Sequence, residues 1–210
     1  VMVDQPAMVK LLLDRGAAAG AESYEGRPLS NARSVPVARL LLEHGAPVNT
    51  PGEQRAPLHA AAYDGRFEVL KELLARGANV NATNSWGATS LHEAARSEAA
   101  RAELALALIN AGANVNARDP GGSTPLHVAV GGFTGCMDGM IPFWVKHSIA
   151  RSRIQVAEAL VAHGADLDAA DSAGRTPLGR AVEEGNRGGR AFLLKHGAHA
   201  TTNRPYAGRH

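Results

Sequence analysis

Histidine is the residue type with the most evident chemical potential in this chain, because its imidazole can bind metals or transfer protons near neutral pH. The chain of 210 residues contains nine histidines. Six of them recur in two fixed settings instead of gathering in one segment, which argues against convergence on a single metal ion. These six are His44, His59, His92, His127, His163 and His196. We therefore predict structural roles for all six.

Other reactive groups are sparse. Cys136 is the one cysteine, and it could be paired with His147 as nucleophile and base, but no known nucleophile motif surrounds it. A single cysteine also excludes an internal disulfide and a cysteine-based zinc site. No G-x-x-x-x-G-K-[ST] phosphate loop occurs. Calcium binding at Asp166, Asp168 and Asp171 is a weaker alternative, because EF-hand spacing is missing. The sequence predicts no catalysis, no cofactor and no metal.

Composition and charge narrow the classes of partner. The formal net charge is +2, the apolar content 45% and the aromatic content 4%. A nearly neutral chain gives no bulk electrostatic reason to expect nucleic acid or a membrane surface. Basic residues gather toward the C-terminus without interleaved aromatics, which favours a solvated face or an acidic protein partner there. These residues are Arg175, Arg180, Arg187, Arg190, Lys195, Arg204 and Arg209.

The sequence shows no apolar run of about 18 residues, as a membrane span would need. It also shows no signal peptide at its start. We expect a cytoplasmic and monomeric protein, with a secreted effector as the alternative.

Two short phrases recur along most of the chain and indicate which elements position these side chains. The first, of the type Thr-Pro-Leu-His-x-Ala, occupies residues 56–61, 89–94, 124–129 and 176–181. The second, of the type Gly-Ala-Asn-Val-Asn, occupies residues 45–49, 77–81, 112–116 and 164–168. A fixed period of this kind means a stack of small units that share one continuous core.

The first phrase resembles the T-P-L-H-x-A signature of the ankyrin-repeat family, which recurs about every 33 residues. The resemblance implies an all-α solenoid of stacked helix-turn-helix units joined by β-turn-like loops. We predict a partial first unit over residues 1–21, then five units and a short tail. The units cover residues 22–50, 51–83, 84–118, 119–170 and 171–203, and the tail covers residues 204–210.

The third unit shows the expected helices most clearly. Pro57 suits the first position of a helix that ends at Tyr63 near Gly65. A second helix follows, with its apolar residues from Phe67 onward at helical spacing. In the second unit, the second helix should begin near Pro36. The leucine of each recurring phrase should lie in the core; these are Leu58, Leu91, Leu126 and Leu178.

The resemblance also assigns the histidines. In the family, the phrase histidine bonds the threonine hydroxyl and nearby turn backbone, which the sequence allows for His92 and His127. Ala56 replaces that threonine before His59, and Gly179 replaces the histidine after Thr176. The other three histidines each precede a glycine that ends a unit, where a donor suits the helix C-terminus.

The fifth unit is much longer than the period, with an insertion over residues 131–153. Its apolar residues Phe133, Met140, Phe143 and Trp144 either fold back on the solenoid or form an exposed anchor for a partner. Pro142 is expected to open an extended second helix that runs through His163.

The family resemblance places a second candidate surface on the concave face, made by turn tips and first helices. Tyr63 and Trp86 are the natural anchors there and could lie on one strip, unless Trp86 packs against the next turn. The further contact candidates on this face are Arg55, Asp64, Glu93, Arg96, Arg175 and Arg180.

We therefore predict a non-catalytic protein-interaction module that binds a protein through its concave face and the fifth-unit insertion. The alternatives are a bacterial effector or toxin-neutralising protein, and the recognition domain of a larger enzyme.

Overall fold

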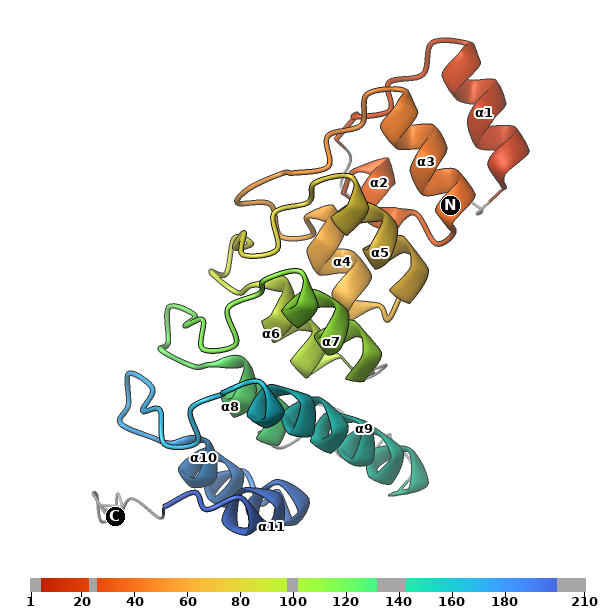
Figure 1. Ribbon diagram of the computed structural model, residues 1–210. Coiled ribbons are helices and arrows are strands. Elements are labelled where there is room, and N and C mark those ends of the chain that lie inside the picture. Colours follow the sequence, from red (N-terminus) through yellow and green to blue (C-terminus); the bar gives the residue numbers. More distant parts are fainter. Residues whose placement is uncertain (1–4, 23–25, 98–101, 132–142, 200–210) are drawn as a thin grey trace, which may run out of the picture.

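The computed structural model describes residues 5–22, 26–97, 102–131 and 143–199, with side chains left out for residues 143–150. These residues form a curved stack of short antiparallel helix pairs (Figure 1). Within them, the sole β contact is an isolated antiparallel bridge between Thr83 and Thr89. The expectation of an all-α repeat solenoid is confirmed.

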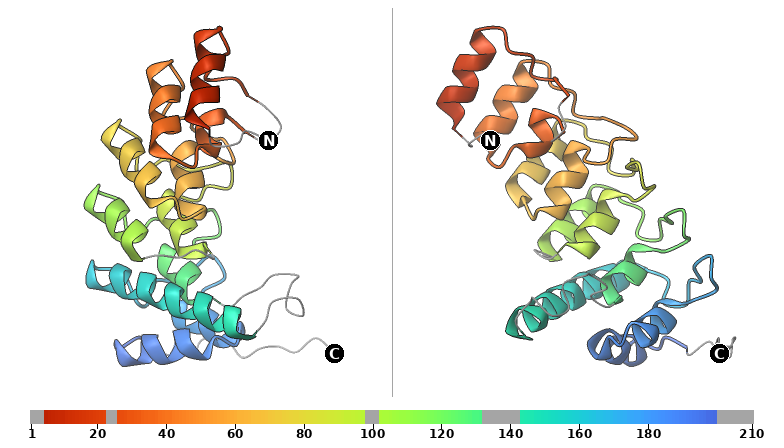
Figure 2. Two further views of the ribbon diagram at one scale, coloured as in Figure 1. Left: turned by 90° about the vertical axis from the view of Figure 1, so that its right-hand side faces the viewer. Right: turned by 180° about the vertical axis from the view of Figure 1, so that it is seen from behind.

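The helices form two parallel rows. The inner row contains the first helix of each pair: α2 (Pro28–Asn31), α4 (Pro57–Tyr63), α6 (Ser90–Arg96), α8 (Pro125–Val130) and α10 (Pro177–Glu183). The outer row contains the second helices: α1 (Pro6–Asp14), α3 (Val35–Glu43), α5 (Phe67–Ala75), α7 (Ala102–Asn110), α9 (Phe143–Ala162) and α11 (Arg187–Lys195). The long loops lie on one side of the stack, and the outer helices lie on the other side (Figure 2).

Local sequence fixes where these helices start and stop. Proline occupies the first turn of α4 and α8, where its missing N–H leaves no helical bond unmade. Gly77 ends α5 with φ of 82°, a left-handed conformation that a side chain would strain. The following Ala78 N–H donates to Leu73 O at 3.0 Å, which closes the helix end. The expected helix starts at Pro57 and near Pro36 are confirmed.

The core is a thin apolar layer between the two rows, continuous from α1 to α11. The four phrase leucines, Leu58, Leu91, Leu126 and Leu178, are buried as predicted. Each lies on a first helix that packs against its own second helix and against the first helix of at least one neighbouring unit. No pair could bury this surface alone, and stability therefore depends on the neighbours.

Asparagine side chains connect the loops of successive units. Asn81, for example, accepts the Asn114 N–H at 2.8 Å and donates to Gly112 O at 3.0 Å. Asn49 and Asn116 make the same two bonds to the units that follow them. These bonds satisfy backbone groups at the helix ends and fix the spacing of the units.

The outer helix α9 is 20 residues long, more than twice the nine of its neighbours α7 and α11. This agrees with the predicted extended helix after Pro142, although Pro142 lies outside the described residues. Figure 2 shows α9 reaching well past the ends of the other outer helices. Within the described residues, no helix has both the length and the apolar composition needed to cross a bilayer.

Candidate binding groove

Two aromatic side chains stand out on the surface. Seven large apolar side chains are exposed among the described residues, and five of these belong to the terminal helices α1, α10 and α11. On those helices, one face has no further described helix packed against it. The remaining two are Tyr63, 41% exposed, and Trp86, 51% exposed, in the middle of the stack. Packing on both sides leaves no such end effect there, so their exposure calls for another reason.

Both aromatics line one groove between the adjacent helices α4 and α6, as expected for a single strip. The groove has a volume of about 440 Å³. It is lined by Gln54, Arg55, His59, Ala60, Tyr63, Trp86, Glu93 and Arg96. Five of the predicted contact residues therefore come together here: Arg55, Tyr63, Trp86, Glu93 and Arg96. They are brought together because α4 and α6 occupy the same place in successive units.

The groove floor contains a buried acidic group. Glu93 was predicted as a contact residue of the concave face, but its side chain is only 5% exposed. Asn84 donates to its Oε1 at 2.9 Å, and Arg96 Nη2 contacts both carboxylate oxygens at 2.6 and 2.7 Å. The partners satisfy the buried charge, so Glu93 holds Arg96 in place instead of facing a ligand freely.

Trp86 is positioned by the residues around it. Asn84 Oδ1 accepts the Trp86 N–H at 3.0 Å, which fixes the turn. The Arg96 guanidinium lies over the indole, 5.9 Å from the ring centroid, at the distance of a cation–π contact. Gly87 lies against Pro120 of the next turn. The turn thus packs on its neighbour through Gly87, while about half of the Trp86 side chain stays exposed to solvent.

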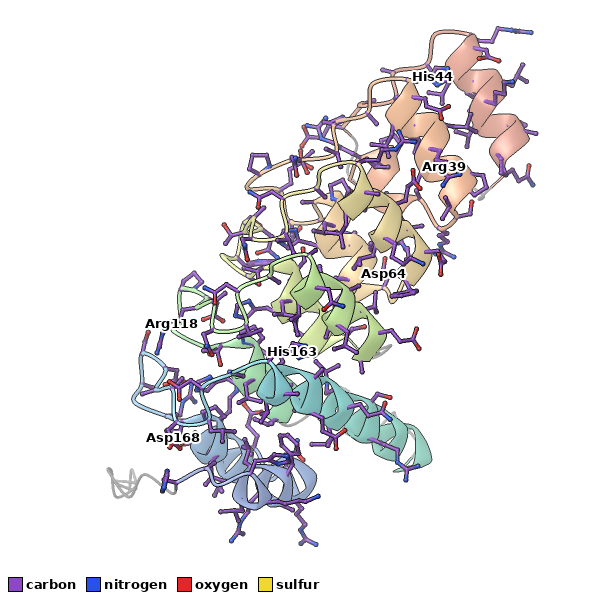
Figure 3. All side chains as sticks on the ribbon, in the orientation of Figure 1. Arg39, His44, Asp64, Arg118, His163 and Asp168 are labelled. Atoms are coloured by element: carbon purple, nitrogen blue, oxygen red, sulfur yellow. The ribbon has the colours of Figure 1, made fainter. Side chains whose placement is uncertain are left out.

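Arg55 connects the groove with a cluster of charges at the end of α4. Asp64 Oδ2 accepts from Arg55 Nη2 at 2.9 Å and also pairs with Arg66. Arg66 reaches across to the preceding unit, where it donates to Ser30 O and Ala32 O at 2.8 and 2.9 Å. Burial lowers the pKa of Arg66, with Asp64 opposing this and the positive charges of Arg55 and Arg33 adding to it. Asp64 lies at the helix ends, away from the loop-side residues Arg118 and Asp168 (Figure 3).

The other predicted contact residues lie elsewhere. Arg175 pairs with Asp171 at 2.8 Å and Glu183 at 3.4 Å, and Arg180 pairs with Glu184 at 3.0 Å. These ion pairs engage two of the seven basic residues near the C-terminus. Neither arginine lines the groove between α4 and α6.

The insertion residues are only partly described. Phe133 and Met140 lie outside the described residues. Phe143 and Trp144 belong to the first turn of α9, whose backbone is described there without side chains. Their role as an anchor stays a prediction.

The phrase histidines are structural, as the resemblance implied. His92 Nδ1 accepts the Thr89 N–H at 3.2 Å and lies 2.9 Å from the Thr89 hydroxyl oxygen, while Nε2 donates to Ser123 O of the next unit at 3.0 Å. His127 makes the same bonds with Thr124 and the backbone of Arg175. This pattern requires neutral imidazoles protonated at Nε2. Burial lowers the pKa of both rings.

The second histidine setting also has a structural role. The Nδ1 atoms of His44, His163 and His196 lie 2.7 to 2.9 Å from the carbonyl four residues earlier. Each imidazole thus bonds an end carbonyl of its own outer helix, as predicted for a donor at a helix C-terminus.

His59 is incomplete by comparison. Its Nε2 donates to Ala88 O at 3.0 Å, but its buried Nδ1 has no hydrogen-bond partner among the described residues, because Ala56 lacks the hydroxyl that Thr89 and Thr124 supply. Burial lowers the pKa of His59, since a charged ring would be poorly solvated there.

Restoring the hydroxyl should therefore stabilise the protein. We expect Ala56→Thr to raise the free energy of unfolding by about 1 kcal/mol, through the new bond to His59 and a capped α4. Chemical denaturation followed by circular dichroism measures the change. Ala56→Val is the matched control, because it adds the same bulk without a hydroxyl. Equal stability of the two variants would contradict the assignment.

A metal-binding grouping is not found among the residues that the structure places. No set of three or more His, Cys, Asp or Glu side chains there could hold a metal ion. Asp168 accepts the backbone N–H and Nδ1 of His199, at 2.9 and 2.7 Å, and Asp171 binds Arg175. These carboxylates thus stabilise the loops by accepting hydrogen bonds from loop residues. Cys136 lies outside the described residues, and the side chain of His147 is not described.

Three features of the groove were missed at the level of sequence. Asn84 fixes both the turn of Trp86 and the carboxylate of Glu93, and it is buried. Gln54 and Ala60 line the groove without any distinguishing pattern. Arg66 ties α4 to the preceding unit. The one available signal was the Asn-x-Trp-Gly order of the turn, which is typical of a tight turn stabilised by an asparagine side chain.

Family models and similar proteins agree with this architecture. A model described as ankyrin repeats in three copies matches residues 1–84 and 58–142, and one described as ankyrin repeats in many copies matches residues 146–194. Ankyrin repeat domain-containing protein 49 of Bos taurus is 49% identical over 51 residues, which are 24% of this chain and 21% of that protein.

Two further similar proteins are a kinase inhibitor and a potassium channel. Cyclin-dependent kinase inhibitor 2A of Homo sapiens is 38% identical over 84 residues, which are 38% of this chain and 54% of that protein. Potassium channel KOR1 of Oryza sativa subsp. japonica is 43% identical over 60 residues, 29% of this chain and 7% of the channel. The chain thus spans about half, or much less, of each relative that it matches.

Proposed function

Because this chain belongs to the ankyrin-repeat family, whose members are generally protein-interaction modules, we propose that it is a non-catalytic module that binds a protein through the groove between α4 and α6. The observation that supports this most is the exposure of Tyr63 and Trp86 in one groove, in the middle of an otherwise well-covered stack. Large aromatic side chains dominate binding energy when a partner buries them.

The groove also has the rigidity that binding favours. Asn84 fixes the backbone of Trp86, the Arg96 guanidinium lies over its indole, and Arg55 pairs with Asp64, so these contacts reduce the freedom that is lost on association. Tyr63 is on a helix and not on a mobile loop. Preorganised aromatic anchors flanked by charged groups are typical of an interaction surface with a polar rim.

The insertion is a proposed second contact. Trp144 and Phe143 lie at the start of α9 and would extend the surface if a partner reached that far. A second candidate function is that of a recognition domain within a larger protein. The match to a small part of a potassium channel favours this candidate.

Selection from a displayed library of random twelve-residue peptides tests the groove. Peptides recovered on the wild-type protein should bind a Tyr63→Ala/Trp86→Ala variant at least about 30-fold more weakly, since hot-spot residues contribute 2 kcal/mol or more. Fluorescence anisotropy of labelled peptides measures the affinities.

The matched control is Leu11→Ala/Leu194→Ala, which removes two equally exposed apolar side chains from the terminal helices. It should leave affinity unchanged. Peptides that bind the groove variant as tightly as the wild type would refute the proposal.

A further inference from the structure

Among the residues that the structure describes, positive charge exceeds negative charge around the groove. Arg55 and Arg96 line the groove, Arg66 shares the Asp64 carboxylate with Arg55, and Arg33 lies close enough for its charge to act on Arg66. The carboxylates that face these arginines are those of Asp64 and Glu93. Glu93 is fully engaged by Arg96 and Asn84 at the floor. The excess therefore lies on the α4 side of the groove.

A single carboxylate oxygen serves two cations at that end. Asp64 Oδ2 pairs with Arg55 and Arg66 at once, so one negative charge compensates two positive charges. Arg33 is exposed and has no carboxylate partner among the described residues, although its charge acts on Arg66. Arg55 itself lines the groove, so the unbalanced charge is continuous with the aromatic wall.

On the basis of the proposed binding function, we propose that the groove recognises an acidic protein segment. A large apolar residue of this segment packs between Tyr63 and Trp86, while neighbouring carboxylates face Arg55 and Arg33. Guanidinium groups bind carboxylates with favourable planar geometry, and complementary charge raises both association rate and selectivity.

A single-stranded nucleic acid is the competing ligand for arginines beside aromatics. The groove favours a peptide because the Arg96 guanidinium already covers one face of the Trp86 indole, where a base would stack.

The random-peptide selection also shows whether the groove prefers acidic peptides. Peptides recovered on the wild-type protein should contain more Asp and Glu than Lys and Arg around an apolar residue. An Arg33→Glu/Arg55→Glu variant should lose about tenfold in affinity for these peptides and should itself select basic ones. Arg33→Glu alone changes only an exposed loop residue and should show part of the effect, which guards against misfolding of the double variant.

Arg187→Glu/Arg190→Glu is the matched control, since both arginines are exposed on α11 far from the groove. It should retain the acidic preference. A dT12 oligonucleotide serves as competitor and should not displace the peptides.

The outcomes separate the two proposals. Peptides that need Tyr63 and Trp86 but show no acidic excess would overturn the charge inference and leave the binding groove intact. Displacement by dT12 at similar concentration would assign the arginines to nucleic acid and also overturn it. Recovery of no peptide that depends on Tyr63 and Trp86 would refute both.

Discussion

Replacing Leu126 with alanine should lower the free energy of unfolding by about 2–5 kcal/mol, the range for other buried leucines. Leu126 is completely buried on α8, which packs on α6, α9 and α10. The cavity left by the substitution would therefore weaken both unit interfaces as well as the helix pair. Because a stack of repeats is stabilised by each unit and its neighbours, this loss could separate the C-terminal units from the rest.

Urea denaturation followed by circular dichroism measures the effect. Leu11→Ala is the control, because Leu11 is 48% exposed on α1 and its truncation should cost no more than about 0.5 kcal/mol. The account predicts a large loss for Leu126→Ala and a second, separate transition if the end units detach. Similar small losses for both variants would contradict a continuous core.

Acidification should destabilise the stack through three buried histidines. Burial lowers the pKa values of His59, His92 and His127 from the ordinary 6.5. Below pH 6.5 the unfolded chain binds protons that the folded chain does not, so stability falls as the pH drops from 6.5 toward the lowered values. Protonation would also place a hydrogen on Nδ1 against the Thr89 and Thr124 N–H groups. Each unit of pKa lowering corresponds to about 1.4 kcal/mol per histidine.

The unfolding midpoint in urea, measured between pH 7.5 and 5, tests this expectation. Hydrogen bonds from His199 hold the pKa of Asp168 below its ordinary 3.8. Burial raises the pKa of Asp171, but the hydrogen bonds from Arg175 and Ala173 outweigh this and keep it below 3.8 as well. Their contributions are therefore lost only at lower pH. His92→Gln should flatten the dependence, because it removes one of the three buried imidazoles whose pKa is lowered. A midpoint that rises on acidification would refute the assignment.

The recurring phrases were sufficient to predict the fold. Pro57, Gly77 and the phrase leucines determine where helices start, stop and meet, and these are local properties of each unit. The loss of the threonine before His59 was also visible, because its partner stands at a fixed offset in the other units. The boundaries between units stay a prediction.

The groove could be predicted only in part. Tyr63 and Trp86 were predicted as anchors because the family resemblance places turn tips and first helices on the concave face. The burial of Glu93 was not predictable, since it depends on Asn84, nine residues earlier, and on the rotamer of Arg96. The shared carboxylate of Asp64 depends on Arg66, which is buried by contacts with the preceding unit. Such side-chain choices follow from packing between units and leave no periodic pattern.

The most direct test of the binding groove uses the two tryptophans, Trp86 and Trp144, which are the whole tryptophan content of the chain. Each gives one indole N–H signal in a ¹⁵N correlation spectrum, and a Trp86→Phe sample assigns them. During titration with a peptide recovered from the library, the account predicts that the Trp86 signal moves progressively and saturates. A Trp86 signal that stays in place at saturation, while the Trp144 signal moves, would contradict it.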